Sequence, residues 1–184
     1  MKKRIAALAA AAALAWMGGC DSLQEQMTDY DALVRETLAR EYSFTAEVAY
    51  NGTDATVQVV KTGAGDLQLD FTAPPSMEGL SVTAEGEELT VRFRGMEVDI
   101  SAYAIPAQSV LTLLREVLAG EKPAKLDIQA DDETVTASGS ILLTSYDLTF
   151  DKETMALTRI LIPSVEGEAD ISDFTFLDQE RADA

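Results

Sequence analysis

The sequence predicts a mainly β (α+β) fold, in which one antiparallel sheet of about ten strands has an apolar face and is accompanied by two helices. Three observations predict it. Apolar and polar residues alternate from Ser43 almost to the C-terminus, as in strands that turn one face to a core. Turn residues interrupt this alternation at short intervals. Two segments, residues 21–42 and 106–120, instead place apolar residues at the three- and four-residue spacing of a helix.

The chain begins with the features of a secretory signal. Cations at positions 2–4 precede the apolar run Ile5–Met17, whose 13 residues fall short of the roughly 20 that a helix needs to span a bilayer. Two glycines then precede Cys20, and this order resembles the lipobox of bacterial lipoproteins. The resemblance implies a diacylglycerol on the Cys20 thiol and removal of residues 1–19. The alternative is an ordinary cleaved signal in which Cys20 is incidental.

A tether and a helix are predicted to follow the signal. Residues 20–28 are expected to form the tether, and residues 29–178 the folded domain, with 179–184 as a frayed tail. Residues 21–42 carry one apolar stripe at helical spacing, formed by Tyr30, Leu33, Val34, Leu38 and Tyr42. A spacer surrounded by solvent would leave such an apolar stripe exposed to water, so we expect this helix to dock on the domain.

Six strands are predicted before residue 102. The first ends at Tyr50 and is followed by Asn51-Gly52, a strong signal for a two-residue hairpin because both residues tolerate positive φ. Pro74 and Pro75 interrupt the ladder, since neither has an N–H to donate. Each strand has one apolar and one polar face, which is typical of an antiparallel sheet with one side in water.

Residues 106–120 form the predicted inserted helix. Pro106 suits its first turn, and Gly120 suits its end. At 3.6 residues per turn its apolar side chains fall within an arc of about 160°. They are Val110, Leu111, Leu113, Leu114, Val117 and Leu118. A face this wide is expected to lie on the apolar face of the sheet. Alternation resumes at Leu126 and continues to Phe176, predicting further strands.

This order of elements resembles the LolA/LolB-like lipoprotein-carrier superfamily. The resemblance is strongest over Tyr42–Gly120, in FTAEVAY, KTGAGDLQLDFTAPPSMEGLSV and ELTVRFRGMEVDI, and it looks most like small lipoproteins of Gram-positive bacteria. It implies a strongly curved sheet, or half-barrel, whose helices enclose an apolar cavity. In carrier members of the superfamily that cavity receives acyl chains. No functional residue of the carriers maps onto this chain by motif.

Composition excludes several classes of function. The chain has no histidine and therefore no Ser-His or Cys-His dyad. Its 14 basic and 32 acidic residues give a net charge of −18, which disfavours nucleic acid as a partner. The acidic groups at 85–88 and at Asp131-Asp132 lack the spacing of a calcium loop, so they are interpreted as turns. We predict a protein that is not an enzyme and has no cofactor and no metal site.

The candidate site is an apolar cavity between the sheet and the inserted helix. Its predicted ligand-binding residues are Met77, Leu80, Val110, Leu111, Leu114 and Leu118. Met77 and Leu80 follow the double proline, where an edge or cavity mouth is expected, and methionine adapts to varied apolar ligands. The alternative is that these side chains seal a packed core.

Two functions follow from these alternatives. In the first, a monomeric lipoprotein on the outer face of the cytoplasmic membrane, held there by its N-terminal lipid anchor, carries a lipid or acyl chain in the cavity. In the second, the same anchored domain has a packed, ligand-free core and serves as an interaction or sensor module for an envelope protein partner. The two functions differ in the volume of the space between the sheet and the inserted helix: the first requires a cavity, and the second predicts a packed core without one.

Overall fold

The computed structural model describes residues 28–178, apart from residues 51, 64, 102–109, 119–124 and 142. The predicted signal, Cys20, most of the tether and the tail lie outside these residues, as do Pro106 and Gly120. The elements are α1 (Tyr30–Ala39), β1 (Tyr42–Tyr50), β2 (Thr53–Thr62), β3 (Asp66–Ala73), β4 (Ser81–Glu85), β5 (Glu88–Phe93), β6 (Met96–Ser101), α2 (Val110–Leu118), β7 (Asp127–Ala130), β8 (Thr134–Ile141), β9 (Thr144–Asp151), β10 (Leu157–Ile162), a 3-10 turn η2 (Pro163–Val165) and β11 (Gly167–Phe176).

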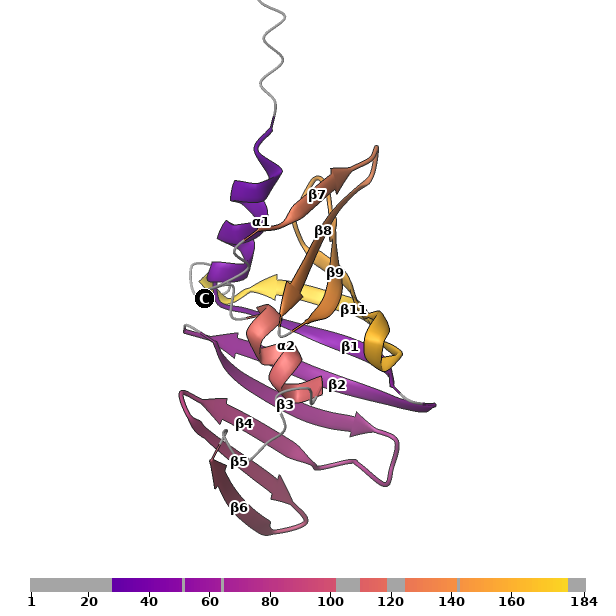
Figure 1. Cartoon of the computed structure of the whole chain (residues 1–184). Coiled ribbons are helices and arrows are strands. Elements are labelled where there is room, and N and C mark those ends of the chain that lie inside the picture. Colours follow the sequence, from indigo (N-terminus) through magenta and orange to yellow (C-terminus); the bar gives the residue numbers. More distant parts are fainter. Residues whose placement is uncertain are drawn as a thin grey trace, which may run out of the picture.

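All of these strands belong to one antiparallel sheet. Their order is β6-β5-β4-β3-β2-β1-β11-β10-β9-β8-β7, so the first and last strands in the sequence meet in the middle. The predicted fold class is confirmed, with eleven strands where about ten were expected. Figure 1 shows that β8 and β9 run steeply across the direction of β1–β3, so the sheet is strongly twisted and both helices lie over one side of it.

The turns follow the predicted chemistry. Tyr50 pairs with Thr53, so the β1–β2 connection is the expected two-residue hairpin, and Gly52 has a φ of 75°. Strand β3 ends at Ala73, where the two prolines begin. The chain then folds back, because the Phe71 N–H donates to the Leu80 carbonyl (2.9 Å) before β4 begins.

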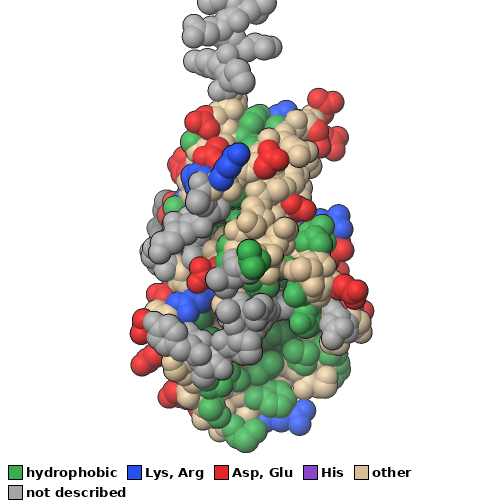
Figure 2. Space-filling view, viewed as in Figure 1, with side chains coloured by type: hydrophobic (Ala, Val, Ile, Leu, Met, Phe, Trp, Pro, Cys, Tyr) green, Lys and Arg blue, Asp and Glu red, His purple; other side chains and the backbone are tan. Residues whose placement is uncertain are grey.

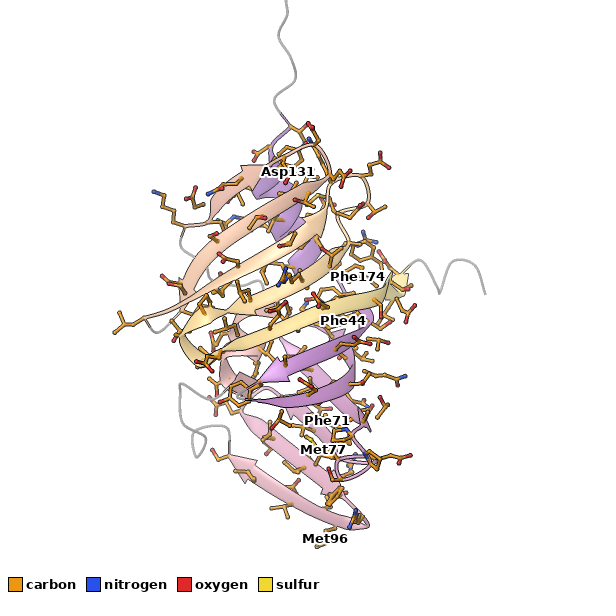
Figure 3. The ribbon with its side chains drawn as sticks, turned by 90° about the vertical axis from the view of Figure 1, so that its right-hand side faces the viewer. Phe44, Phe71, Met77, Met96, Asp131 and Phe174 are labelled. Atoms are coloured by element: carbon orange, nitrogen blue, oxygen red, sulfur yellow. The ribbon has the colours of Figure 1, made fainter. Side chains whose placement is uncertain are left out.

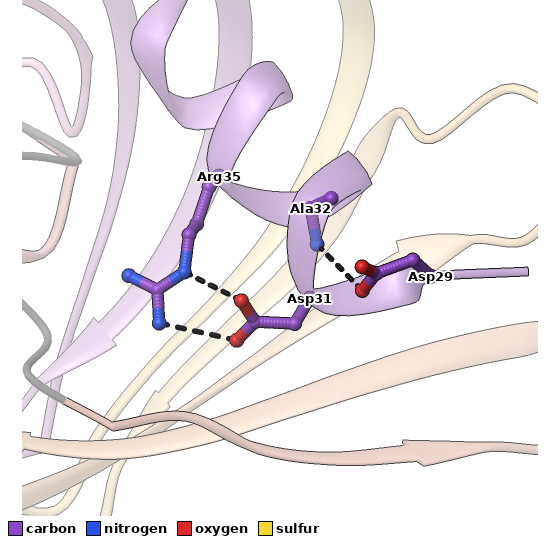
Figure 4. A network of polar contacts seen from close by, with 4 residues as sticks. All are labelled: Asp29, Asp31, Ala32 and Arg35. Atoms are coloured by element: carbon purple, nitrogen blue, oxygen red, sulfur yellow. Dashed lines mark hydrogen bonds and ion pairs between the residues drawn. The ribbon is translucent and has the colours of Figure 1, made fainter.

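Helix α1 begins with two local contacts that Figure 4 shows together. The Asp29 side chain caps the helix by accepting from the Ala32 N–H (3.1 Å). One turn on, the Arg35 guanidinium donates to Asp31 (2.7 Å), and this hydrogen bond lowers the pKa of the Asp31 carboxyl. Asp31 also lies in the first turn, where a negative charge complements the helix dipole.

The inner side of α1 packs against β7 and β8, as predicted from its apolar stripe. Val34 and Leu38 are fully buried there. Tyr42, which the sequence placed on the same stripe, is instead the first residue of β1 and pairs with Lys61 and Phe176. The helix ends at Ala39 because Arg40 adopts an extended conformation, so the prediction for Tyr42 was wrong.

The C-terminal end of α1 is held against the last described residues of the chain. Nη2 of Arg40 donates to both carboxylate oxygens of Asp178 (2.7 and 2.8 Å), and the guanidinium lies 3.5 Å from the centroid of the Phe176 ring. Lys61 is buried nearby, and its ammonium donates to the carbonyls of Arg40 (2.9 Å) and Gly63 (3.1 Å). These contacts fix the junction of β1, β2 and β11, which carries the site described next.

Candidate functional site

A cavity of about 280 Å³ lies between helix α2 and the apolar face of the sheet. Its floor consists of inward-facing side chains of β1, β2, β3, β10 and β11, and α2 contributes the opposite wall. Sites for small molecules typically measure roughly 300–1,000 Å³, so the volume of this cavity lies just below that range. Figure 2 shows hydrophobic side chains gathered over the lower part of this face, with a hollow among them.

Small residues create the space in the floor. The register places Ala169, Val48 and Ala55 side by side on β11, β1 and β2, and all three line the cavity. In the next row toward the interior, Ala46 stands beside Val57. A methyl group reaches only a short way above the sheet, so these rows leave a gap beneath α2 that larger side chains would close.

Larger side chains close the inner end and one side of the cavity. Phe44, Val59 and Leu69 are buried at the inner end, and they lie on three adjacent strands. Phe71, near the end of β3, and Met77, in the loop after the double proline, line one side of the cavity. Figure 3 shows Phe71 and Met77 near one another, on the same half of the molecule as Met96.

Helix α2 is held over the floor by polar contacts at two points. The Tyr42 hydroxyl donates to the Leu118 carbonyl (3.4 Å), and burial raises the pKa of that hydroxyl. The Arg115 guanidinium donates to the carbonyl of Gly86, in the turn between β4 and β5. The helix can therefore present Leu114 and Leu118 to the cavity from a fixed position.

Of the six residues predicted to bind a ligand, Met77, Leu114 and Leu118 line the cavity. Leu80 is half-buried beyond it, on the return of the chain to β4. Val110 and Leu111 belong to α2, but their side chains lie outside the described residues. Whether any of these residues binds a ligand stays a prediction.

The floor residues were not singled out from the sequence. Ala46, Ala55 and Ala169 occupy inward positions of central strands, where valine, leucine and isoleucine are more usual. An inward alanine on adjacent strands is the signal that would have found the cavity, but reading it requires the β1–β11 pairing. That pairing joins residues more than a hundred positions apart.

The chemistry of the cavity is almost entirely apolar. Among the described lining residues, the polar groups are the hydroxyls of Thr53 and Tyr50, and none of the side chains is charged. Within the described part of the chain, no group of three or more His, Cys, Asp or Glu side chains is placed to hold a metal ion. Such a cavity can enclose hydrocarbon, and its described side chains include no candidate general base.

The acidic turns considered from the sequence lie elsewhere. The Asp131 carboxylate accepts from the backbone N–H groups of Thr134 (2.7 Å) and Glu133 (2.9 Å) in the β7–β8 turn, and these bonds lower its pKa. Glu85 and Glu88 pair with each other across the β4–β5 turn. Both segments are turns, as interpreted.

Among the described helices, none is long and apolar enough to cross a membrane.

Comparisons with known proteins place the chain by fold. No protein-family model matches it, and no curated protein matches its sequence. Among solved structures, an uncharacterised conserved protein from Thermus thermophilus superposes with a TM-score of 0.52 at 12% identity, covering 80% of this chain and 86% of that one. This similarity shows a shared fold.

Two further solved structures align with lower TM-scores. A LolA superfamily protein from Nitrosomonas europaea aligns with a TM-score of 0.44 at 14% identity, over 79% of this chain and 92% of that chain. The Mycobacterium tuberculosis lipoprotein LppX aligns with a TM-score of 0.38 at 12% identity, over 80% and 96% of the two chains. The open, twisted antiparallel sheet with two helices agrees with the mainly β architecture that the sequence predicted.

Proposed function

We propose that this chain is a lipoprotein that binds the hydrocarbon part of a lipid in the cavity beneath α2 and acts as a non-catalytic carrier or chaperone. The observation that supports the proposal is the cavity itself, a space of about 280 Å³ whose described walls are apolar. Water gains little in such a space because it finds few polar partners there, whereas an acyl chain buries its surface at about 25 cal/mol per Å².

The proposed location follows from the N-terminus. Lipid on Cys20 would hold the domain at the outer face of the cytoplasmic membrane, with residues 20–28 as a tether. There the cavity has access to membrane lipids. The strongly acidic composition keeps the folded domain off the anionic headgroups, so the lipid anchor supplies the attachment. Mass spectrometry of the purified chain, before and after lipase treatment, tests for a diacylglycerol on Cys20.

Ligand binding is tested on the Cys20→Ser variant of the full chain, purified from bacteria and examined by native mass spectrometry. We expect adducts of lipid mass that disappear after extraction and return when lipid is supplied. The same measurement on Ala55→Leu, which adds a side chain to the cavity floor, is expected to show no adduct. Ala49→Leu is the matched control, because Ala49 is exposed on the other face of β1. Equal adducts on both variants would contradict binding in this cavity.

A second candidate, recognition of an envelope protein, is favoured by a different observation. Met96 and Val98 on the edge strand β6 are 65% and 54% exposed. Exposed apolar groups on an edge strand favour pairing with a partner strand. Replacing both with lysine would abolish a partner complex and leave lipid adducts unchanged if β6 is the interface.

A further inference from the structure

The cavity has a closed end and an open end. Phe44, Val59 and Leu118 at the inner end are buried, whereas Tyr50 is 39% exposed and Thr53 is exposed. Both exposed residues flank the β1–β2 hairpin, so the opening lies at that hairpin. From Thr53 to Val59 the floor extends along β2 for about 20 Å at the usual rise of a strand. This length and the volume of about 280 Å³ fit one extended chain and leave no room for a second.

The opening offers hydrogen-bonding groups without charge. The hydroxyls of Tyr50 and Thr53 are the polar groups among the described side chains that line the cavity. An ionised head group held between these side chains gives up part of its hydration, and the described wall offers no cation in its place. Even partial burial of an uncompensated charge costs more than burial of an uncharged hydroxyl or ester.

The convex face behind the opening is negatively charged. Asp54 and Glu168 lie on either side of Ala49 in the register of β2, β1 and β11. Glu47 and Asp170 pair with each other in the next row. Among the described residues, Arg159 is the cation that contacts this group, through Glu168 and Asp170. Four carboxylates thus share one described cation, and the local field at the hairpin is negative.

We infer that the cavity selects ligands by head group: it takes a single acyl chain, tail first, whose head group at the β1–β2 hairpin is uncharged, such as a fatty alcohol or a monoacylglycerol. An ionised fatty acid of the same length is discriminated against. This inference rests on the proposed function, because it names the class of ligand for that cavity. The apolar wall provides affinity for the chain, and the hairpin with its carboxylates decides between head groups.

The test compares ligands that differ only at the head group. Binding of dodecanol and of dodecanoate to the full chain with Cys20→Ser is measured by calorimetry at pH 7 and low salt, below the solubility limit of dodecanol and the micelle concentration of dodecanoate. Dodecanoate is ionised at this pH. We expect dodecanol to bind about tenfold more tightly, the ratio that one or two screened charge repulsions produce. Salt is expected to narrow the ratio because it screens the carboxylates.

Charge variants then test the cause of the selectivity. Asp54→Asn combined with Glu168→Gln is expected to tighten dodecanoate binding about threefold or more by removing repulsion, and to leave dodecanol binding unchanged. Asp127→Asn, on the far edge strand β7, is the matched control and is expected to change neither. Each of these positions is exposed or half-buried, so the variants are expected to fold.

The outcomes separate the inference from the function on which it rests. Equal affinities, or tighter binding of dodecanoate, would overturn the head-group selectivity while leaving lipid binding intact. A tenfold ratio that the double variant does not change would overturn the role of the hairpin carboxylates. Failure of both ligands to bind would instead overturn the proposed function.

Discussion

Strands β8 and β9 share one sheet and one apolar face with strands β11, β1 and β2, yet the two regions fill the space above that face differently. In β8 and β9 each small inward residue is matched by a large neighbour: Ala137 pairs with Leu148, and Gly139 with Tyr146. Across β11, β1 and β2, by contrast, one row has no large side chain at all: Ala169, Val48 and Ala55 stand next to one another. Pairing of side-chain sizes between strands therefore decides whether a helix seals the sheet or leaves a cavity.

The helices reinforce this difference. Helix α1 buries Val34 and Leu38 completely against β7 and β8, and Leu148 and Phe150 beneath are inaccessible as well. Helix α2 buries Leu118 but leaves Leu114 half-buried beside the cavity. A cavity lowers the stability of the fold because the side chains around it lack contacts, and the contacts of the packed half offset this loss.

The largest expected effect is a difference in unfolding free energy between two variants in which a leucine is replaced by alanine. Leu148→Ala in the packed half should cost about 4 kcal/mol of unfolding free energy, because it removes buried contacts and creates a new void. Leu69→Ala, at the wall of the existing cavity, should cost about 2 kcal/mol, since it enlarges space already present. Urea unfolding of the two variants measures both. Equal losses would mean that the cavity half is as tightly packed as the other.

The converse substitutions should show the same contrast with a smaller effect. Ala137→Leu forces a larger side chain against Leu148 and is expected to lose about 1–3 kcal/mol. Ala55→Leu enters free space and is expected to change stability by less than about 0.5 kcal/mol. Thermal unfolding distinguishes the two cases. A large loss for Ala55→Leu would indicate that no usable space exists beneath α2.

The junction between the two halves should contribute less. Arg40→Ala removes the ion pair to Asp178 and the stacking on Phe176, and is expected to cost about 1 kcal/mol because the pair is partly exposed to solvent. Arg92→Ala is the control: Arg92 on β5 pairs with Glu97 on β6, and its side chain is more exposed than that of Arg40, so its loss should stay within about 0.5 kcal/mol. If Arg92→Ala cost as much as Arg40→Ala, the junction would have no special role.

The smallest effect expected is a pH dependence of stability that arises from carboxyl groups in the turns of the packed half. Hydrogen bonds from Thr134 and Glu133 lower the pKa of Asp131, and those from Thr154 lower the pKa of Asp151. A carboxyl whose pKa is lower in the folded state stabilises the fold above its unfolded pKa of about 3.9, and this contribution disappears as the pH falls through the folded value. NMR titration should therefore find both pKa values below 3.8. A value above that for either would contradict the turn geometry.

The sequence predicted the class of the fold well, because alternation and turn residues are local signals. The hairpin that pairs Tyr50 with Thr53 and the end of β3 before Pro74 were both predicted this way. Tyr42 was misplaced because its spacing from Leu38 is helical, although the helix ends at Ala39. The spacing of apolar residues indicates which face of a helix or strand a side chain lies on, but it does not indicate the residue at which that helix or strand ends.

The candidate site was only partly predictable. Leu114 and Leu118 followed from the apolar arc of the inserted helix, and Met77 from its place after the prolines. The alanine row depends on long-range register, which aligns Ala169 with Val48 only once β1 and β11 are paired. A cavity is set by the volume that side chains leave unfilled, and no local pattern in one strand reports that volume.

Where a bound chain lies is the measurement that tests the central claim most directly. A fatty alcohol with a diazirine at the end of its tail is bound to the full chain with Cys20→Ser, activated by light, and mapped by peptide mass spectrometry. We predict adducts at the inner end of the cavity, on Phe44, Val59 or Leu118. Adducts confined to the exposed Met96 and Val98 of β6 would contradict insertion of the chain beneath α2 and would assign the apolar ligand to the outer edge.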